Sequence, residues 1–282
     1  MTQDLRISTM SREELDIAID WAAAEGWNPG LHDRDSYYAA DPEGFLIGRV
    51  GDEPVATISV VRYDERFGFL GFYIVHPEHR GRGYGSALWR AGMQRLAGCT
   101  VGLDGVPAQQ DNYRKSGFEL AWRNVRYEGR GGGERVEDAR IVPLVSLTLD
   151  ELTEFERPFF PAQRTDFLLA WLAQSDSLAL GCVEEGCLVG YGVVRACRNG
   201  YKLAPLYADR PDVAELLFSA LVSCVEPGEP VFLDIPEPNA EARALVGRHA
   251  MQPQFETARM YAGPAPTLPV ERIYGMTSFE IG

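Results

Sequence analysis

The sequence predicts an α/β protein built from two copies of one unit. The order of helices and strands in the first half recurs in the second half. Laying residues 45–62 on residues 178–195 without a gap gives the identities Gly48/Gly181, Val50/Val183, Val60/Val193, Val61/Val194 and Arg62/Arg195. A chain of 282 residues is long for one compact domain and comfortable for two. We therefore expect one unit at residues 1–135 and a second at residues 136–282, rather than a single irregular domain.

A helix and a loop open the first unit. Ser11 is followed three residues later by Glu14, which is the capping box of a helix start. Apolar residues then fall on one helical face until Gly26, where the helix is expected to end. Residues 26–35 contain Asn-Pro-Gly and are predicted to form a loop.

Strands and two further helices complete the first unit. Residues 44–64 indicate two strands around a turn at Gly51 and Asp52. The apolar and aromatic run FGFLGFYIV, residues 67–75, indicates a third strand. A helix is expected from Ser86 to Ala97. The strand TVGLDGV, a short helix in AQQDNYRKSGF and the strand FELAWRNVRYEG follow.

The second half repeats this order with recognisable local matches. LTLDEL (147–152) carries the same capping box as MSREEL (10–15). The later matches are VFLD (231–234) with VGLD (101–104), and MYAG (260–263) with RYEG (126–129). A chance similarity would not preserve the element order through both halves.

The segment HPEHRGRGYGSALW, residues 76–89, is the most informative part of the chain. Arginines alternate with glycines here, although the whole chain has 41 acidic and 27 basic residues. A strand precedes the segment and a helix follows it, so free backbone N–H groups and the helix dipole point at one place. Glycine allows close approach and arginine adds forked donors, which predicts a bound phosphate or pyrophosphate.

Three phosphate motifs compete for this segment. A Walker loop requires a lysine before its serine, and Gly85-Ser86 has none. A dinucleotide-binding fingerprint is one residue longer than GRGYG, and its strand would normally begin the domain. Asp104 at the end of the next strand imitates the acid that binds ribose, so the dinucleotide alternative stays open.

The third motif is the best match. The run RGRGYG after YIVHPEH resembles the acetyl-CoA motif of the GNAT (GCN5-related N-acetyltransferase) superfamily, with Arg80, Gly83 and Gly85 at the motif positions. NYRKSGF, residues 112–118, resembles the tyrosine-to-Gly-Phe helix end of the same family. The resemblance covers residues 1 to about 140. It implies two tandem GNAT-like domains, each a mixed, mostly antiparallel sheet flanked by helices, with a degenerate second copy.

The resemblance also implies roles for individual residues. The strand before the loop splays from its neighbour, and the backbone of Tyr73, Ile74 and Val75 binds pantetheine and the acetyl carbonyl, with the Val75 N–H as the polarising donor. Tyr113 matches the tyrosine that protonates the departing thiolate, or else its ring only covers the core. The residues that would wrap the pyrophosphate are Arg80, Gly81, Arg82, Gly83, Tyr84, Gly85 and Ser86.

The acceptor side is less well specified. In the family, the region between the first helix and the first hairpin lines this side, so Trp27, His32, Asp33 and Tyr37 are candidates, with packing or surface roles as the alternative. No acid lies within FGFLGFYIV. Asp64, Glu65 and Asp104 are more typical of surface or structural acids, so the sequence does not assign a general base.

The second copy lacks the glycine loop. RPDV, residues 210–213, replaces it, and Asp212 would repel a pyrophosphate at the helix N-terminus. We expect this copy not to bind acetyl-CoA in the same way. It would either close the acceptor pocket or only stabilise the first unit.

Composition narrows the remaining possibilities. A net charge of -14 argues against general nucleic-acid binding. No signal-peptide core and no apolar run long enough to span a membrane are present. The five cysteines have no paired C-x-x-C spacing and only four histidines are present, so we expect no metal site. The cysteines are expected to be free thiols in a reducing cytoplasm.

Taken with the resemblance, these observations predict a cytoplasmic N-acetyltransferase that uses acetyl-CoA. The amine would attack bound acetyl-CoA directly in a ternary complex, because no cysteine is placed to carry the acyl group. The acidic balance suggests a small cationic amine as the partner, with no nucleic acid or membrane involved. The alternatives are a non-catalytic protein that senses or scaffolds around coenzyme A, and a dinucleotide-dependent oxidoreductase.

Overall fold

The computed structural model describes residues 5–282, so the first four residues of the predicted first unit lie outside the described part. The strands of the first unit are β1 (Leu5–Thr9), β2 (Phe45–Val50), β3 (Glu53–Arg62), β4 (Phe67–Val75), β5 (Thr100–Gly105) and β6 (Phe118–Arg130). Its helices are α1 (Leu15–Ala24), α2 (Asp33–Ala40), α3 (Tyr84–Arg95) and α4 (Gln110–Lys115).

The local signals of the first unit are present, with two corrections. Strand β1, which the sequence did not indicate, precedes the helix that was expected to open the unit. The Ser11 N–H donates to the Glu14 carboxylate at 2.8 Å, and the Glu14 N–H donates to Ser11 Oγ at 3.2 Å, which forms the predicted capping box. The predicted loop at residues 26–35 is too long. It ends at His32, because Asp33 and Asp35 stabilise the first turn of α2.

The second unit has the predicted elements and some that the sequence did not indicate. Its strands are β7 (Ile141–Pro143), β8 (Ser177–Glu184), β9 (Cys187–Ala196), β10 (Tyr201–Ala208), β11 (Pro230–Pro236), β12 (Gln252–Ala262) and β13 (Ile273–Gly275). Its helices are α5 (Leu149–Glu156), α6 (Thr165–Leu172), α7 (Pro211–Val222) and α8 (Ala240–Arg248). Thr148 and Glu151 form the expected capping box at the start of α5.

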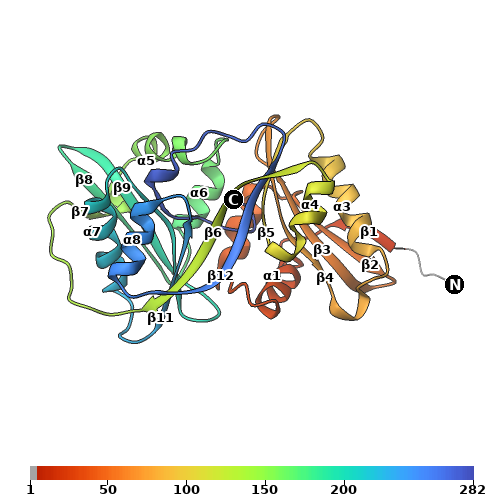
Figure 1. Ribbon diagram of the computed structural model, residues 1–282, viewed down its shortest axis with the longest axis horizontal. Helices are drawn as coiled ribbons and strands as arrows, with labels where there is room; N and C mark the ends of the chain where they lie inside the picture. The colour runs from red at the N-terminus through yellow and green to blue at the C-terminus, as the bar shows by residue number, and fades with distance from the viewer. Residues whose placement is uncertain (1–4) are drawn as a thin grey trace.

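All the strands belong to one mixed sheet, which the two units share (Figure 1). Its order is β1-β2-β3-β4-β5-β12-β6-β11-β10-β9-β8-β7, with β13 paired to β10. Only the β4–β5 and β10–β11 pairs are parallel. The predicted boundary between residues 135 and 136 falls in the connection between β6 and β7, where the sheet itself does not divide.

The two units exchange their last long strands. β12 of the second unit lies between β5 and β6 of the first, and β6 in turn pairs with β11. Figure 1 shows β6 and β12 running side by side through the middle of the molecule. Asn124 of β6 lies opposite Thr257 of β12, 133 residues later, which is the same offset that lays residues 45–62 on residues 178–195. The strands therefore meet about a local pseudo-twofold axis.

Two equivalent buried ion pairs connect the exchanged strands. Arg259 of β12 lies opposite Asp104 of β5, with Arg259 Nε 2.8 Å from Asp104 Oδ1. Arg126 of β6 lies opposite Asp234 of β11, with Arg126 Nε 2.6 Å from Asp234 Oδ1. In each pair one unit supplies the arginine and the other supplies the carboxylate. Removing either partner would leave a buried charge without compensation.

One hydrophobic core joins the two units, and separate cores lie on the opposite face of the sheet. One core is shared by both units and packs α1 and α2 with α5 and α6 against one face of the sheet, where Trp171 and Tyr37 are fully buried. On the other face, α3 covers the first half and α7 and α8 cover the second. The shared core and the exchanged strands make the two units one folded body.

The described residues were also compared with the requirements for membrane spans, metal sites and disulfides. Within residues 5–282, no helix combines the length and the apolar composition required to cross a bilayer. The same residues contain no group of His, Cys, Asp and Glu side chains that could hold a metal ion. All five cysteines are unpaired thiols.

Candidate active site

Strands β4 and β5 separate part-way along their length. Their parallel pairing runs from Phe67↔Thr100 to Leu70↔Leu103 and stops there. β4 remains paired with β3 up to Val75↔Ala56. The segment Gly71–Val75 and the end of β5 line a cavity of about 390 Å³. The structure thus contains the splayed strands that the resemblance implies, and it places Tyr73, Ile74 and Val75 on the cavity wall.

A β-bulge redirects β4 where the strands separate. Phe72 has a positive φ of 44°, and the register of β3 and β4 shifts between Thr57 and Ser59. The Thr57 hydroxyl donates to the Phe72 carbonyl at 2.9 Å, which holds the bulge. A bulge bends its strand and changes the direction in which backbone groups point. No sequence pattern had indicated it.

The glycine loop leads into the N-terminus of α3. Gly81 and Gly83 have φ values of 79° and 84°, which residues with a Cβ rarely adopt. Gly83 is the N-cap of α3, so no side chain caps the first backbone N–H groups. Gly85 has a different role, since an added Cβ would lie 2.8 Å from both Tyr73 Oη and Val75 Cγ2. Tyr84 and Ser86 flank it in the first turn of α3.

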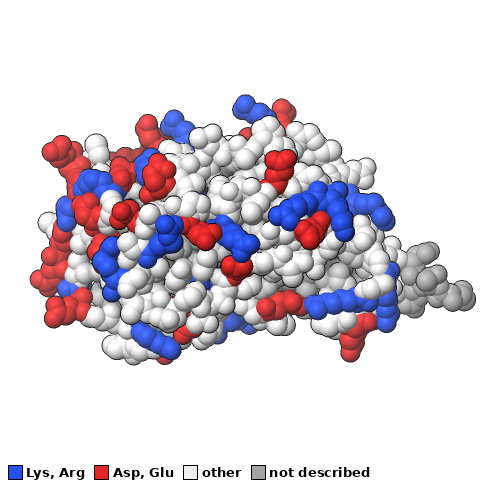
Figure 2. Space-filling view, viewed as in Figure 1, with Lys and Arg blue, Asp and Glu red and all other residues white. Residues whose placement is uncertain are grey.

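The arginines of the loop differ in their contacts. Arg80 Nε donates to the Val75 carbonyl at 3.0 Å, and its guanidinium also pairs with Glu25. Arg82 is exposed, with no ion pair to the residues that the structure describes. Figure 2 shows basic side chains gathered over the part of the first unit where Figure 1 places α3 and α4, whereas acidic ones gather at the far end of the second unit. The uncapped helix, the left-handed glycines and this local positive charge fit a pyrophosphate.

Tyr113 lies on the opposite wall of the cavity from β4. It projects from α4, packs its ring against Gly105, and stacks on Trp89 with 5.7 Å between ring centroids. Burial raises the pKa of Tyr113 to about 12, and the neighbouring Tyr73 adds to the rise. Its hydroxyl therefore keeps its proton at neutral pH, as a general acid requires.

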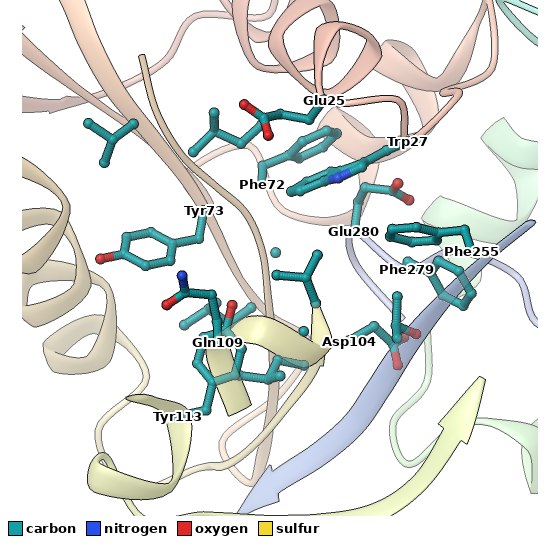
Figure 3. A pocket seen from close by; sticks show the side chains of 18 of the residues that line it. Glu25, Trp27, Phe72, Tyr73, Asp104, Gln109, Tyr113, Phe255, Phe279 and Glu280 are labelled. Carbon is teal, nitrogen blue, oxygen red and sulfur yellow. The ribbon is translucent and has the colours of Figure 1, made fainter. Parts of the chain in front are cut away.

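Aromatic residues from both units form the other end of the cavity. Trp27 comes from the α1–α2 connection, Phe255 from β12, and Phe279 and Glu280 from the closing segment, residues 276–282. Figure 3 shows these four on one side of the cavity and Tyr73 and Tyr113 on the other. The sequence analysis did not find Phe255, Phe279 and Glu280, because their contact with the cavity depends on long-range packing that no local pattern reports.

The four predicted acceptor residues are placed differently from one another. Trp27 lines the cavity. Tyr37 is fully buried behind the wall, where its hydroxyl donates to Glu280 at 3.1 Å. Asp33 does not reach the cavity, because its carboxylate is buried against Arg195 and the Gly30 N–H. His32 is on the surface, 2.9 Å from Asp176, and does not line the cavity either.

Two of the acids that the sequence left open have structural contacts. Asp64 accepts hydrogen bonds from the backbone N–H groups of Arg66 and Phe67 in the turn before β4. Asp104 lines the cavity but is paired with Arg259 and accepts a hydrogen bond from Asn124 at 2.8 Å. The dinucleotide alternative fails here, because Asp104 is not free for a ribose and the sheet is not the parallel, doubly wound one it requires.

The corresponding cleft of the second unit is closed. The parallel pairing of β10 and β11 stops at Leu203↔Leu233, as it does in the first unit. Here β13 pairs with β10, and the Met276 N–H donates to the Asp234 carbonyl of β11 at 2.8 Å. The chain itself thus fills this cleft. Asp212 lies in the first turn of α7, in place of the glycine loop.

Comparison with known proteins agrees with this geometry. Residues 12–118 match the family described as "Acetyltransferase (GNAT) family", and residues 152–275 match "Acetyltransferase (GNAT) domain". A holothin acyltransferase from Pseudoalteromonas sp. (strain SANK 73390) is 31% identical over 272 residues, which are 96% of this chain and 92% of that protein. The chain belongs to the GNAT superfamily.

Two solved structures share the fold of this GNAT protein over nearly the whole chain. A putative acetyltransferase from Pyrococcus horikoshii has a TM-score of 0.83 at 24% identity, covering 100% of this chain and 97% of the other. A tandem GNAT protein from the clavulanic acid biosynthesis pathway has a TM-score of 0.66 at 15% identity, covering 93% and 100%. The expectation of two GNAT domains in a mixed α/β fold is confirmed, and the protein is an acyltransferase by family.

Proposed function

We propose that this GNAT protein is an acetyl-CoA-dependent N-acetyltransferase that acts on a primary amine of a small molecule. The observation that carries the proposal is the cavity at the split between β4 and β5, which continues from the glycine loop side to an aromatic end. The relative named holothin acyltransferase supports acyl transfer. Five unpaired cysteines support a reducing cytoplasm as the location.

Each wall of the cavity has a role in this proposal. Acetyl-CoA supplies an activated thioester. The N-terminus of α3 and the loop Arg80–Ser86 hold the pyrophosphate, and the backbone of Tyr73, Ile74 and Val75 binds the pantetheine and polarises the carbonyl. Tyr113 protonates the leaving thiolate. No cysteine is among the residues that line the cavity, which supports direct attack in a ternary complex.

The small-molecule acceptor follows from how the aromatic end is built. Its walls come from the α1–α2 connection, from β12 and from the closing segment, so parts of both units enclose it. This arrangement supports a role of the second unit in closing the acceptor pocket. If the second unit only stabilised the first, side chains of the second unit would not be required on the cavity wall.

Two measurements test the proposal. The full chain, acetyl-CoA and a panel of primary amines are assayed for thiol release, with the acetylated amine identified by mass spectrometry. We expect turnover with at least one amine. Binding of acetyl-CoA without turnover on any amine would favour the alternative of a protein that senses coenzyme A.

The Gly83→Asp variant tests the cofactor site. A side chain at φ 84° and a carboxylate at the helix N-terminus both oppose a pyrophosphate, so we expect acetyl-CoA affinity to fall by at least about tenfold in calorimetry. Gly98→Asp is the matched control. Gly98 also has a positive φ, of 89°, and open space around it, but it follows the other end of α3. Equal loss in both variants would contradict the assignment.

A further inference from the structure

We propose that Glu280 selects the acceptor as a cationic primary amine on an aromatic or apolar body and takes the proton that the ammonium must lose. This inference rests on the proposed function and names the substrate class of the same site. Its basis is one carboxylate that the closing segment delivers into the aromatic end of the cavity (Figure 3).

The backbone of the closing segment is anchored at the split between β4 and β5. The Ser59 hydroxyl donates to the Glu280 carbonyl at 2.8 Å, and the Tyr63 hydroxyl donates to the Ile281 carbonyl at 2.8 Å. Gly71, the first β4 residue after the split, packs so closely that an added Cβ would overlap the Glu280 carbonyl. Glu280 is thus held beside the β4 backbone that is proposed to bind the acetyl group.

One face of the carboxylate is held by the protein and the other faces the cavity. Glu280 Oε2 accepts hydrogen bonds from Ser278 Oγ at 2.7 Å and from Tyr37 Oη at 3.1 Å. No donor among residues 5–282 contacts Oε1. Only 4% of the residue is exposed, and it is one of the residues that line the cavity. Two hydroxyl donors orient the group while one oxygen is left for a ligand.

The charges around Glu280 do not neutralise it. The titratable groups facing it are Tyr37 and Asp33 of α2, Asp104 of β5, and two cations, Arg195 of β9 and Arg126 of β6. Both cations are already paired, Arg195 with Asp33 and Arg126 with Asp234. Asp104 is paired with Arg259.

A buried carboxylate without a cation is costly, and a cationic ligand would remove that cost. Two other acids line the cavity, and both are paired, Glu25 with Arg80 and Asp104 with Arg259. Glu280 is therefore the wall carboxylate that stays free for an ammonium.

The shape of this end indicates the rest of the acceptor. The side chains of Trp27, Phe72, Phe255 and Phe279 surround Glu280 in Figure 3. Aromatic walls favour an aromatic or apolar body, and ring faces also attract an ammonium. In the reaction, the nitrogen loses two protons as the amide bond forms and the C–S bond breaks. The ammonium gives its first proton to Glu280, which passes it to solvent. After the attack, the nitrogen gives its second proton to solvent, Tyr113 donates its proton to the departing sulfur, and solvent returns a proton to Tyr113.

The inference is tested without turnover by measuring how two probes bind to the full chain at neutral pH. The probes are 2-phenylethylamine, which is an ammonium ion, and 2-phenylethanol, its neutral counterpart. We expect the amine to bind the wild type at least about tenfold more tightly than the alcohol. Glu280→Gln should abolish this preference while leaving the affinity for the alcohol unchanged, and Glu280→Asp should restore part of it.

Glu271→Gln is the control, because it makes the same charge change at an exposed position that precedes the closing segment. Equal affinity of the two probes, failure of both to bind, or an unchanged preference in Glu280→Gln would each overturn the inference. Folding of the variants is checked by their thermal unfolding.

A turnover assay distinguishes a failure of this inference from a failure of the proposed function. If no amine is acetylated, the proposed function fails, whereas the probe preference still decides the role of Glu280 in binding. If amines are acetylated, Glu280→Gln should lower kcat/KM by at least about tenfold, and wild type should prefer amines with apolar bodies. Equal turnover by Glu280→Gln would overturn the inference while the proposed function stands.

Discussion

At the scale of single residues, the site combines groups with strong local signals and groups with none. The loop glycines were predictable because left-handed backbone and close packing both require glycine, and the sequence spacing alone indicated them. Glu280 was not predictable. It touches Gly71 and Ser59 far away in the sequence, and no pattern around it differs from that of an ordinary closing strand. His32 and Asp33 were mistaken for acceptor contacts because the start of α2 turns them away from the cavity.

Tyr113 provides a prediction about pH. Because burial raises its pKa to about 12, the hydroxyl keeps its proton up to at least pH 10, where an ordinary tyrosine would be half ionised. Tyr113→Phe should lower kcat on the order of 10²-fold with little change in acetyl-CoA affinity. The ratio of wild-type to variant kcat should stay constant from pH 7 to pH 10. A ratio that declines with a midpoint near pH 10 would mean that Tyr113 has the pKa of an exposed tyrosine, which would contradict its burial.

At the scale of elements, the sequence predicted the long strands but not the short strands β1 and β7, and not all of the strand partners. β6 and β12 carry equivalent patterns, so either strand could complete either half of the sheet with similar burial. The choice is made by long-range contacts, namely the cross-strand pairs Arg259–Asp104 and Arg126–Asp234 and the shared core. Hydrophobic periodicity reports the burial of a strand and not the identity of its neighbour.

The exchange of β6 and β12 predicts that the two halves depend on each other. Residues 1–135 expressed alone would expose the edge of β5 and leave Asp104 buried without Arg259. We expect this fragment to aggregate or remain unfolded, and co-expression with residues 136–282 to yield a soluble complex. Size-exclusion chromatography and circular dichroism measure both outcomes. A monomeric, folded fragment 1–135 would show that β6 can replace β12 beside β5.

At the scale of the whole molecule, the two GNAT domains are unequal in one decisive respect. The cleft between β4 and β5 is open, whereas β13 and Met276 close the cleft between β10 and β11. The sequence indicated this inequality through the missing glycine loop. It could not indicate that the second cleft is filled by the chain's own later residues.

This inequality predicts one molecule of acetyl-CoA per chain. Isothermal titration of the full chain should give a stoichiometry of one, and Gly83→Asp should weaken this single site without revealing a second one. Two molecules bound per wild-type chain, or binding of unchanged affinity in Gly83→Asp, would mean that the second cleft opens. Coenzyme A without the acetyl group serves as a further ligand, because it shares the pyrophosphate.

The anchoring of the closing segment also orders the assembly of the enzyme during translation. Strand β4 leaves the ribosome long before residues 276–282 are made, yet Ser59 and Gly71 complete their packing only against Glu280. A chain that stops just before residue 276 would contain the glycine loop, Trp27 and Phe255 but would lack Phe279 and Glu280. Such a chain would have the elements proposed to bind the acyl donor without the carboxylate proposed to orient the amine, so a bound thioester would be more open to water. We therefore expect acyl transfer only from chains whose synthesis has reached residues 276–282.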